Sequence, residues 1–157
     1  MAVLVDEKTK LLVQGITGKT GQFHTGRMKS YGTNVVAGTS PGKGGQAVED
    51  VPVFDTVAEA VEATGCNTSV LFLPARFVLD SAVEACRAGI ELIVVVPEHI
   101  PVQDMLRLRE EGERTLERIE GRAVDAGIPF VGAIRESGSI HRSIIDYADE
   151  EGVDLIV

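Results

Sequence analysis

The stretch KLLVQGITGKTGQFHTGRMKSYGTNVVAG, residues 10–38, decides the fold. An apolar run at 10–14 is followed by a glycine-rich turn, a helical stretch at 20–31 and a second apolar run at 34–37. This order predicts a β-α-β unit, in which a helix crosses over between two parallel strands.

The same alternation continues along the chain. It predicts further strands at 69–73, 91–96, 129–134 and 153–157, a short edge strand at 52–54, and helices at 56–64, 76–88, 101–126 and 139–151. Five helices end at a glycine, where left-handed backbone is favoured: Gly32, Gly65, Gly89, Gly127 and Gly152. Apolar strands separated by helices predict a doubly wound, mostly parallel Rossmann-like α/β sheet with helices on both faces, in three layers.

Composition limits the classes of function. A chain of 157 residues with 44% hydrophobic content has the length of one domain, residues 1–157. Its net charge of −9 argues against a nucleic-acid partner, because phosphate backbones are bound by an excess of Lys and Arg. A phosphorylated small molecule remains open, since it needs only a few local cations and backbone N–H groups.

Neither cysteine belongs to a recognisable disulfide or metal motif. Cys66 and Cys86 have no C-x-x-C pairing and no His at ligand spacing, so we expect reduced, structural thiols. The first residues lack the basic and apolar regions of a signal peptide, and no apolar run approaches the ~20 residues of a membrane span. We therefore expect a soluble, cytoplasmic protein with no membrane partner.

Glycines at 15, 18 and 21 suggest the first functional motif. They follow the first strand directly, in the pattern G-x-x-G-x-x-G, which differs from both the dinucleotide G-x-G-x-x-G and the P-loop. Glycine lets backbone approach a phosphate closely, and the following helix start offers unpaired N–H donors. A tight turn without a ligand is the alternative.

Three further strand ends supply candidate groups. The turn TSPGKGG at 39–45 leaves the same sheet edge in a parallel sheet, so Lys43 is expected in the same crevice, unless it is simply solvated. Pro74 and its apolar neighbours could cover a base or an acyl arm, or merely start a helix. Glu98 could accept a ribose or adenine hydrogen bond, whereas His99 suits a solvent-facing loop.

Residues 1–106 resemble the N-terminal CoA-binding domain of the succinate–CoA ligase α subunit, through VLVD, VQGITGKTGQFHT, YGTNVVAGTSPGKGG, VPVFDTVAEAV and IPVQDML. The resemblance implies that the two glycine-rich loops hold CoA phosphates and that the later strand ends line the nucleotide. The implied binding residues are Thr17, Gly18, Lys19, Thr20, Gly21, Gln22, Ser40, Pro41, Lys43, Phe72, Leu73, Pro74, Val96 and Glu98. No catalytic residue and no metal ligand is predicted.

The chain departs from that family at several points. Arg76 stands where the family usually has Pro, and PEH at 97–99 replaces the usual Thr-Glu-Gly. Residues 132–136, GAIRE, stand where an Asn-Cys-Pro loop is expected. The family's domain with the phosphorylated histidine is missing, and none of His24, His99 and His141 has a matching context, so no ligase activity is predicted for the chain alone.

From about residue 109 the sequence resembles a universal stress protein segment, with a helix, a strand ending in Arg-Glu and a second helix leading to DLIV. All the lysines lie at or before residue 43, and every later cation is Arg. We therefore hypothesise an engineered or recombined, non-catalytic chimera, in which residues 107–157 complete the sheet begun by 1–106 and CoA or an adenine nucleotide binds the two loops.

Two other functions remain open. One is a truncated succinate–CoA ligase α-subunit fragment that needs a β subunit. The other is an ATP-binding stress-type module, whose usual terminal glycine loop is absent. In any of these cases the last strand, 153–157, could pair with a second copy, so a homodimer is credible.

Overall fold

The computed structural model describes residue 5 and residues 7–125. The chain divides into two compact units, of which one is Thr9–Glu111 and the other combines Met1–Lys8 with Gly112–Val157. The strands predicted at 129–134 and 153–157, the helix predicted at 139–151 and the caps Gly127 and Gly152 lie outside the described residues. All the strands that the structure describes lie within the unit Thr9–Glu111.

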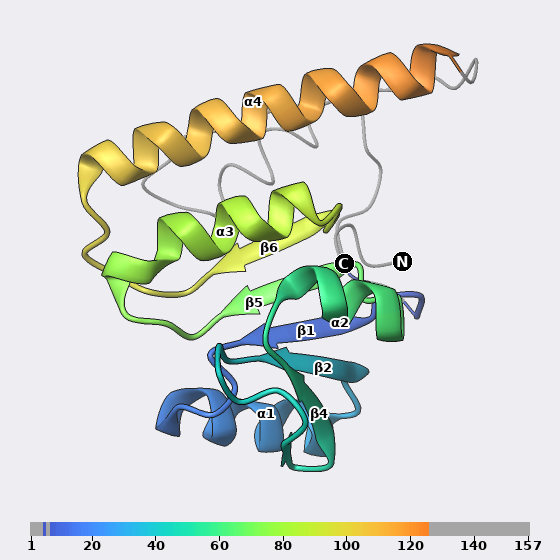
Figure 1. Ribbon diagram of the computed structural model, residues 1–157, viewed down its shortest axis with the longest axis vertical. Helices are drawn as coiled ribbons and strands as arrows, with labels where there is room; N and C mark the ends of the chain where they lie inside the picture. Colours follow the sequence, from blue (N-terminus) through green and yellow to red (C-terminus); the bar gives the residue numbers. More distant parts are fainter. Residues whose placement is uncertain (1–4, 6, 126–157) are drawn as a thin grey trace. The chain divides into compact units, whose positions relative to one another are not determined.

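The described residues form a six-stranded sheet in the order β3-β4-β2-β1-β5-β6 (Figure 1). The strands are β1 (Leu11–Gln14), β2 (Val35–Thr39), β3 (Ala47–Val48), β4 (Val51–Phe54), β5 (Thr68–Leu71) and β6 (Leu92–Val95). The helices are α1 (Lys19–Tyr31), α2 (Val57–Thr64), η1 (Ala75–Phe77), α3 (Val78–Arg87) and α4 (Val102–Asp125). Every strand pair is parallel except β3–β4, so the predicted mostly parallel sheet is confirmed.

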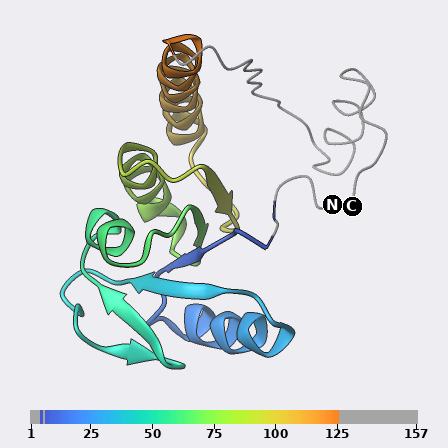
Figure 2. The ribbon, with the colours of Figure 1, turned by 90° about the vertical axis from the view of Figure 1, so that its right-hand side faces the viewer.

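Helices cover both faces of the sheet, with α1 on one face and α2 and α3 on the other (Figure 2). The central strand β1 shows why. Leu12 is fully buried with Val57 of α2 and Ala85 of α3, whereas Val13 is fully buried in a second cluster, against which Met28 of α1 packs. Alternate side chains of a strand point to opposite faces, so an apolar run such as LLV needs cover on both sides. The predicted three-layer, doubly wound Rossmann-like fold is confirmed.

A glycine lies at the end of each of α1, α2 and α3, as predicted. Gly32, Gly65 and Gly89 have φ angles of +96°, +66° and +84°, in the left-handed region that glycine adopts without strain. No helix among the described residues is both long enough and apolar enough to cross a bilayer.

The strand at 52–54 was expected at the sheet edge, and that expectation is wrong. It is part of β4, which lies between β2 and the two-residue strand β3. β3 was missed because Ala47 and Val48 are too few to show a periodic pattern. The predicted strand 69–73 also ends earlier, because Phe72 and Leu73 follow β5 in the turn.

The hairpin between β3 and β4 is closed by Glu49 and Asp50, both with positive φ, at +50° and +62°. Two left-handed residues between paired strands are the signature of a type I′ turn, which favours Asn-Gly. Lys29 of α1 holds the turn from the side: its Nζ donates to the Glu49 carbonyl and lies 3.9 Å from Asp50 Oδ2. The backbone of the turn is therefore strained, because Glu49 and Asp50 carry side chains at positive φ, but Lys29 holds it in place.

Replacing the turn by Glu49→Asn together with Asp50→Gly is expected to raise the free energy of unfolding by about 1 kcal/mol, because relief at two left-handed residues exceeds the loss of an exposed ion pair. Urea unfolding gives the measurement. Glu49→Ala is the control, since alanine remains strained at positive φ and should bring no gain. An unchanged urea midpoint for the double variant would contradict the strain at this turn.

Candidate functional site

A cavity of about 340 Å³ lies at the carboxyl edge of the sheet. Parallel strands bring the segments that follow β1, β5 and β6 to this one edge, where open α/β sheets bind ligands. The first segment contributes the start of α1, and the other two contribute mostly apolar side chains. The cavity is lined by Gly18, Lys19, Thr20, Leu71, Phe72, Leu73, Pro74, Val96 and Pro97.

The turn after β1 depends on glycine at position 15. Gly15 has a φ of +77°, and its N–H donates to the Thr39 carbonyl at 2.9 Å. A Cβ at this position would lie 2.6 Å from the Phe72 carbonyl oxygen and 2.7 Å from Leu73 Cδ2. Only glycine lets the segment after β5 come this close, so Gly15 determines how the cavity wall meets the turn.

The start of α1 has no side-chain cap. Its N-cap is Gly18, in extended backbone, which makes no side-chain hydrogen bond to the first-turn amides. The start of α2 is closed instead: Thr56 Oγ1 accepts from Glu59 N at 3.2 Å, and Glu84 Oε1 accepts from Val57 N at 2.7 Å. Orphan amides and the helix dipole at an uncapped start favour an anion. Because Lys19 and Thr20 line the cavity, the uncapped start borders it.

Lys43 reaches the first glycine turn from the loop after β2. Its Nζ donates to Thr17 Oγ1 at 3.3 Å, and Thr17 Oγ1 donates to Ser40 Oγ at 2.9 Å. The two glycine-rich turns, predicted to share one crevice, are thus joined by direct hydrogen bonds. The Lys43 side chain is exposed, so its ammonium can exchange these contacts for an arriving anion.

An aromatic stack stands beside this edge. The His24 and Phe72 rings are stacked, with centroids 4.7 Å apart and an interplanar angle of 7°. Phe23 meets His24 edge-on at 5.2 Å. The sequence argument gave His24 no role at the cavity. Its position four residues after Thr20 in α1, on the same helix face, was the available signal.

The remaining predicted residues occupy three kinds of position. Gln22 braces the turn, its Nε2 donating to the Thr17 carbonyl at 2.8 Å, while Gly21 is buried directly beneath it. Pro41 and Glu98 are exposed and do not line the cavity. Leu71 and Pro97 do line it and were not predicted, although each lies next to a residue that was.

His99 explains one departure from the expected sequence. Its φ is +61°, in the region that favours glycine. The Gly of the usual Thr-Glu-Gly pattern would adopt this conformation without strain. This chain has the left-handed bend after Glu98 with a His side chain on it.

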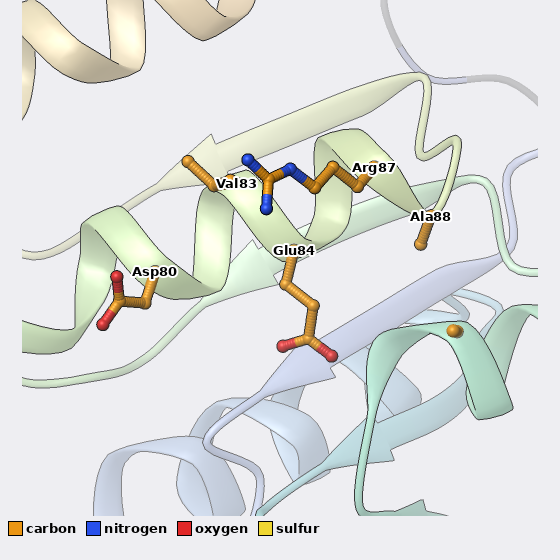
Figure 3. A pocket seen from close by; sticks show the side chains of 6 residues that line it. Asp80, Val83, Glu84, Arg87 and Ala88 are labelled. Atoms are coloured by element: carbon orange, nitrogen blue, oxygen red, sulfur yellow. The ribbon is translucent and has the colours of Figure 1, made fainter.

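A second hollow, of about 430 Å³, lies between α2 and α3 (Figure 3). Two of its charged residues have partners within the protein: Glu84 points toward α2 and accepts from its first amide, and Arg87 Nε lies 3.6 Å from Glu111 Oε1. It is lined by helix side chains and not by strand ends, so we regard the smaller cavity as the functional candidate. The larger hollow is lined by Ala58, Asp80, Val83, Glu84, Arg87 and Ala88.

The two cysteines, Cys66 and Cys86, differ in burial. Neither forms a disulfide, and burial raises the pKa of the Cys66 thiol, which reduces its thiolate fraction at neutral pH. Within the described part of the chain, no group of three or more His, Cys, Asp or Glu side chains is placed to hold a metal ion.

The sequence is similar to a known family and to known proteins over most of its length. Residues 6–99 match the family described as CoA binding domain. The α subunit of ADP-forming succinate–CoA ligase from Aquifex aeolicus is 57% identical over 110 residues, covering 70% of this chain and 36% of that protein. The corresponding subunit from Staphylococcus epidermidis is 40% identical over 174 residues, covering 98% of this chain and 56% of that protein. The chain thus spans between about a third and just over half the length of these relatives.

Solved structures support the fold alone. Dipicolinate-bound dihydrodipicolinate reductase from Paenisporosarcina sp. TG-14 aligns with a TM-score of 0.56 at 13% identity, covering 69% of this chain and 44% of that one. A conserved hypothetical protein from Pyrococcus furiosus aligns with a TM-score of 0.56 at 20% identity, and the alignment covers 66% of this chain and 88% of that one.

These relatives overturn the hypothesis of a chimera. The alignment with the Staphylococcus epidermidis subunit covers 98% of the chain, so it continues past residue 109 into the segment that was compared with universal stress proteins. The predicted junction between two proteins near residue 107 is therefore wrong. The hypothesis of an engineered or recombined origin, which depended on that junction, is wrong as well. The cause of the error is physical: a helix, a strand and a glycine turn occur in every parallel α/β protein and do not distinguish between families.

The glycines of α1 test the close packing under the cavity. A Cβ at Gly21 would overlap the Gly15 carbonyl oxygen and lie 2.9 Å from Ile16 Cα, whereas a Cβ at Gly26 would meet only the Glu49 side chain, at 3.7 Å. Gly21→Ala is expected to lower the free energy of unfolding by about 1–3 kcal/mol through overpacking. Gly26→Ala in the same helix is expected to raise it by about 0.5–1 kcal/mol through helix propensity. Urea unfolding of both variants is the measurement, and equal effects would contradict the contact.

Proposed function

The chain belongs to the CoA-binding domain family, and from this premise we propose that its cavity at the carboxyl edge of the sheet binds the phosphate-bearing part of CoA. The proposal depends above all on one observation, the uncapped start of α1 beside the Lys43 ammonium. Backbone N–H donors and a lysine are the groups that bind phosphate in many nucleotide sites.

The rest of the cavity fits the remaining chemistry of CoA. Phe72, Leu73, Pro74 and Val96 give an apolar wall beside the polar helix start. Small-molecule sites combine such a wall with a few placed polar groups, in volumes of roughly 300–1,000 Å³. A cavity of about 340 Å³ holds part of CoA, with the remainder lying across the neighbouring surface. Exposed Pro41 and Glu98 are proposed to contact that remainder.

We further propose that the chain serves as the CoA-binding part of a succinate–CoA ligase α subunit. The names of its relatives support this, since they are α subunits of ADP-forming succinate–CoA ligase. Turnover of succinate, CoA and nucleotide would then require a β subunit. No reaction step is assigned to a residue of this chain, so its proposed role is binding.

Two other predictions stay proposals. A single domain over residues 1–157 and a homodimer through 153–157 both depend on residues outside the described part. A cytoplasmic location is supported by the two thiols, which are free of disulfides in the structure.

Calorimetric titration with CoA tests the site. Wild-type chain is expected to bind CoA, and Lys43→Ala is expected to weaken binding at least about tenfold, because a charge-assisted hydrogen bond contributes on the order of 1.5–3 kcal/mol. Lys10→Ala is the matched control: it removes the same charge at the amino end of β1, where Nζ donates to the Thr64 carbonyl. Its affinity should stay near that of the wild type.

A parallel titration with dephospho-CoA shows whether the 3′-phosphate contributes. Absence of binding heat for both ligands on folded chain would remove the proposed function. Equal losses for Lys43→Ala and Lys10→Ala would instead show that only overall charge matters.

A further inference from the structure

The loop that carries Lys43 is attached to the next strand of the sheet. It leaves β2 at Ser40, whose N–H donates to the Phe54 carbonyl at 3.1 Å, and Gly45 N donates to the Val53 carbonyl at 2.9 Å. Between these two points, the Gly44 N–H donates at 2.9 Å to a side chain, Oδ1 of Asp55. The residue next to Lys43 is thus held by the carboxylate that follows β4.

The absence of a side chain at Gly44 leaves room for the Asp55 carboxylate beside the Gly44 amide. A Cβ on Gly44 would lie 2.7 Å from Asp55 Oδ2 and 3.0 Å from its Cγ. A side chain at position 44 would require the carboxylate to shift from this position.

Asp55 itself is fixed by the start of α2. Its N–H donates to Glu59 Oε2 at 3.2 Å, while Glu59 N donates to Thr56 Oγ1 at 3.2 Å. A continuous path of contacts leads from the cap of α2 through Asp55 and Gly44 to Lys43, and from Lys43 Nζ to Thr17 Oγ1.

The charge of Asp55 excludes a direct role in holding phosphate. Like charges repel, so a carboxylate beside a phosphate site weakens phosphate binding unless it also positions a group that binds the phosphate. We propose that Asp55 is a positioning residue, which holds the Lys43 loop against the first glycine turn. This inference rests on the proposed CoA site and names a residue that acts on it through Lys43.

The first test needs no ligand. Asp55→Ala removes the acceptor and the charge, and Asp55→Asn keeps an acceptor oxygen and removes only the charge. Glu62→Ala, the control, removes an exposed carboxylate from the nearby helix α2. By NMR relaxation, the Gly44 order parameter is expected to fall below about 0.6 in Asp55→Ala and to stay near about 0.85 in the other two. A rigid Gly44 in Asp55→Ala, on folded protein, would overturn the inference even if the chain bound no CoA.

The second test measures affinity for CoA by calorimetry. Asp55→Ala is expected to weaken binding about five- to tenfold, as for loss of one hydrogen bond, with Asp55→Asn and Glu62→Ala within about twofold of wild type. In a Lys43→Ala background the Asp55→Ala effect should shrink below about twofold, because both changes act on one contact.

Three results would overturn the positioning role: equal affinity of Asp55→Ala and wild type, tighter binding by Asp55→Ala, or an undiminished Asp55→Ala effect without Lys43. Failure of the proposed function looks different, since wild type itself would then bind no CoA.

Discussion

Backbone packs directly against backbone at the carboxyl end of β1, and the rest of the site depends on this contact. Gly21 of α1 lies on the Gly15 carbonyl, and Gly15 lies against the Phe72 carbonyl. Gly38 of β2 leaves room for the Ile16 side chain in the same place. These absent side chains let a helix and two strands converge on one turn, so fold stability and cavity shape depend on the same three positions.

Two helices of the same sheet treat their first amides differently, and the contrast gives the cavity its chemistry. Thr56 and Glu84 close the start of α2 from inside the protein, while α1 begins at a glycine with no side-chain cap. The net charge of −9 does not exclude anion binding at the start of α1. Exposed charges further away than roughly 10 Å are screened at ordinary ionic strength, so the nearby amides and Lys43 determine local affinity.

Sequence reasoning predicted most of the fold because the signals were local. The run LLV at 11–13 needs cover on both faces, and Gly32, Gly65 and Gly89 each end a helix at a positive φ. The prediction that the two glycine turns lie at one edge of the sheet follows from the parallel topology, because the carboxyl ends of parallel strands lie at the same edge. Sequence reasoning missed β3, the stacking of His24 on Phe72 and the contact of Asp55 with Gly44. Each depends on a short element or on residues distant in sequence, for which no local pattern exists.

The comparison of the segment after residue 109 with universal stress proteins was wrong because it, too, depended on local patterns. Periodic apolar residues report that a segment is a helix or a strand, and every parallel α/β protein supplies them in the same order. The change from Lys to Arg after residue 43 was no better guide, because both residue types usually lie in solvent in folded proteins, where the fold does not choose between them. Positions such as Gly15 and Gly21 carry more information, since a Cβ there would overlap the backbone of a particular partner, Phe72 for Gly15 and Gly15 for Gly21. Residues at positions where the backbone geometry admits only one residue type are therefore the best guide to the family.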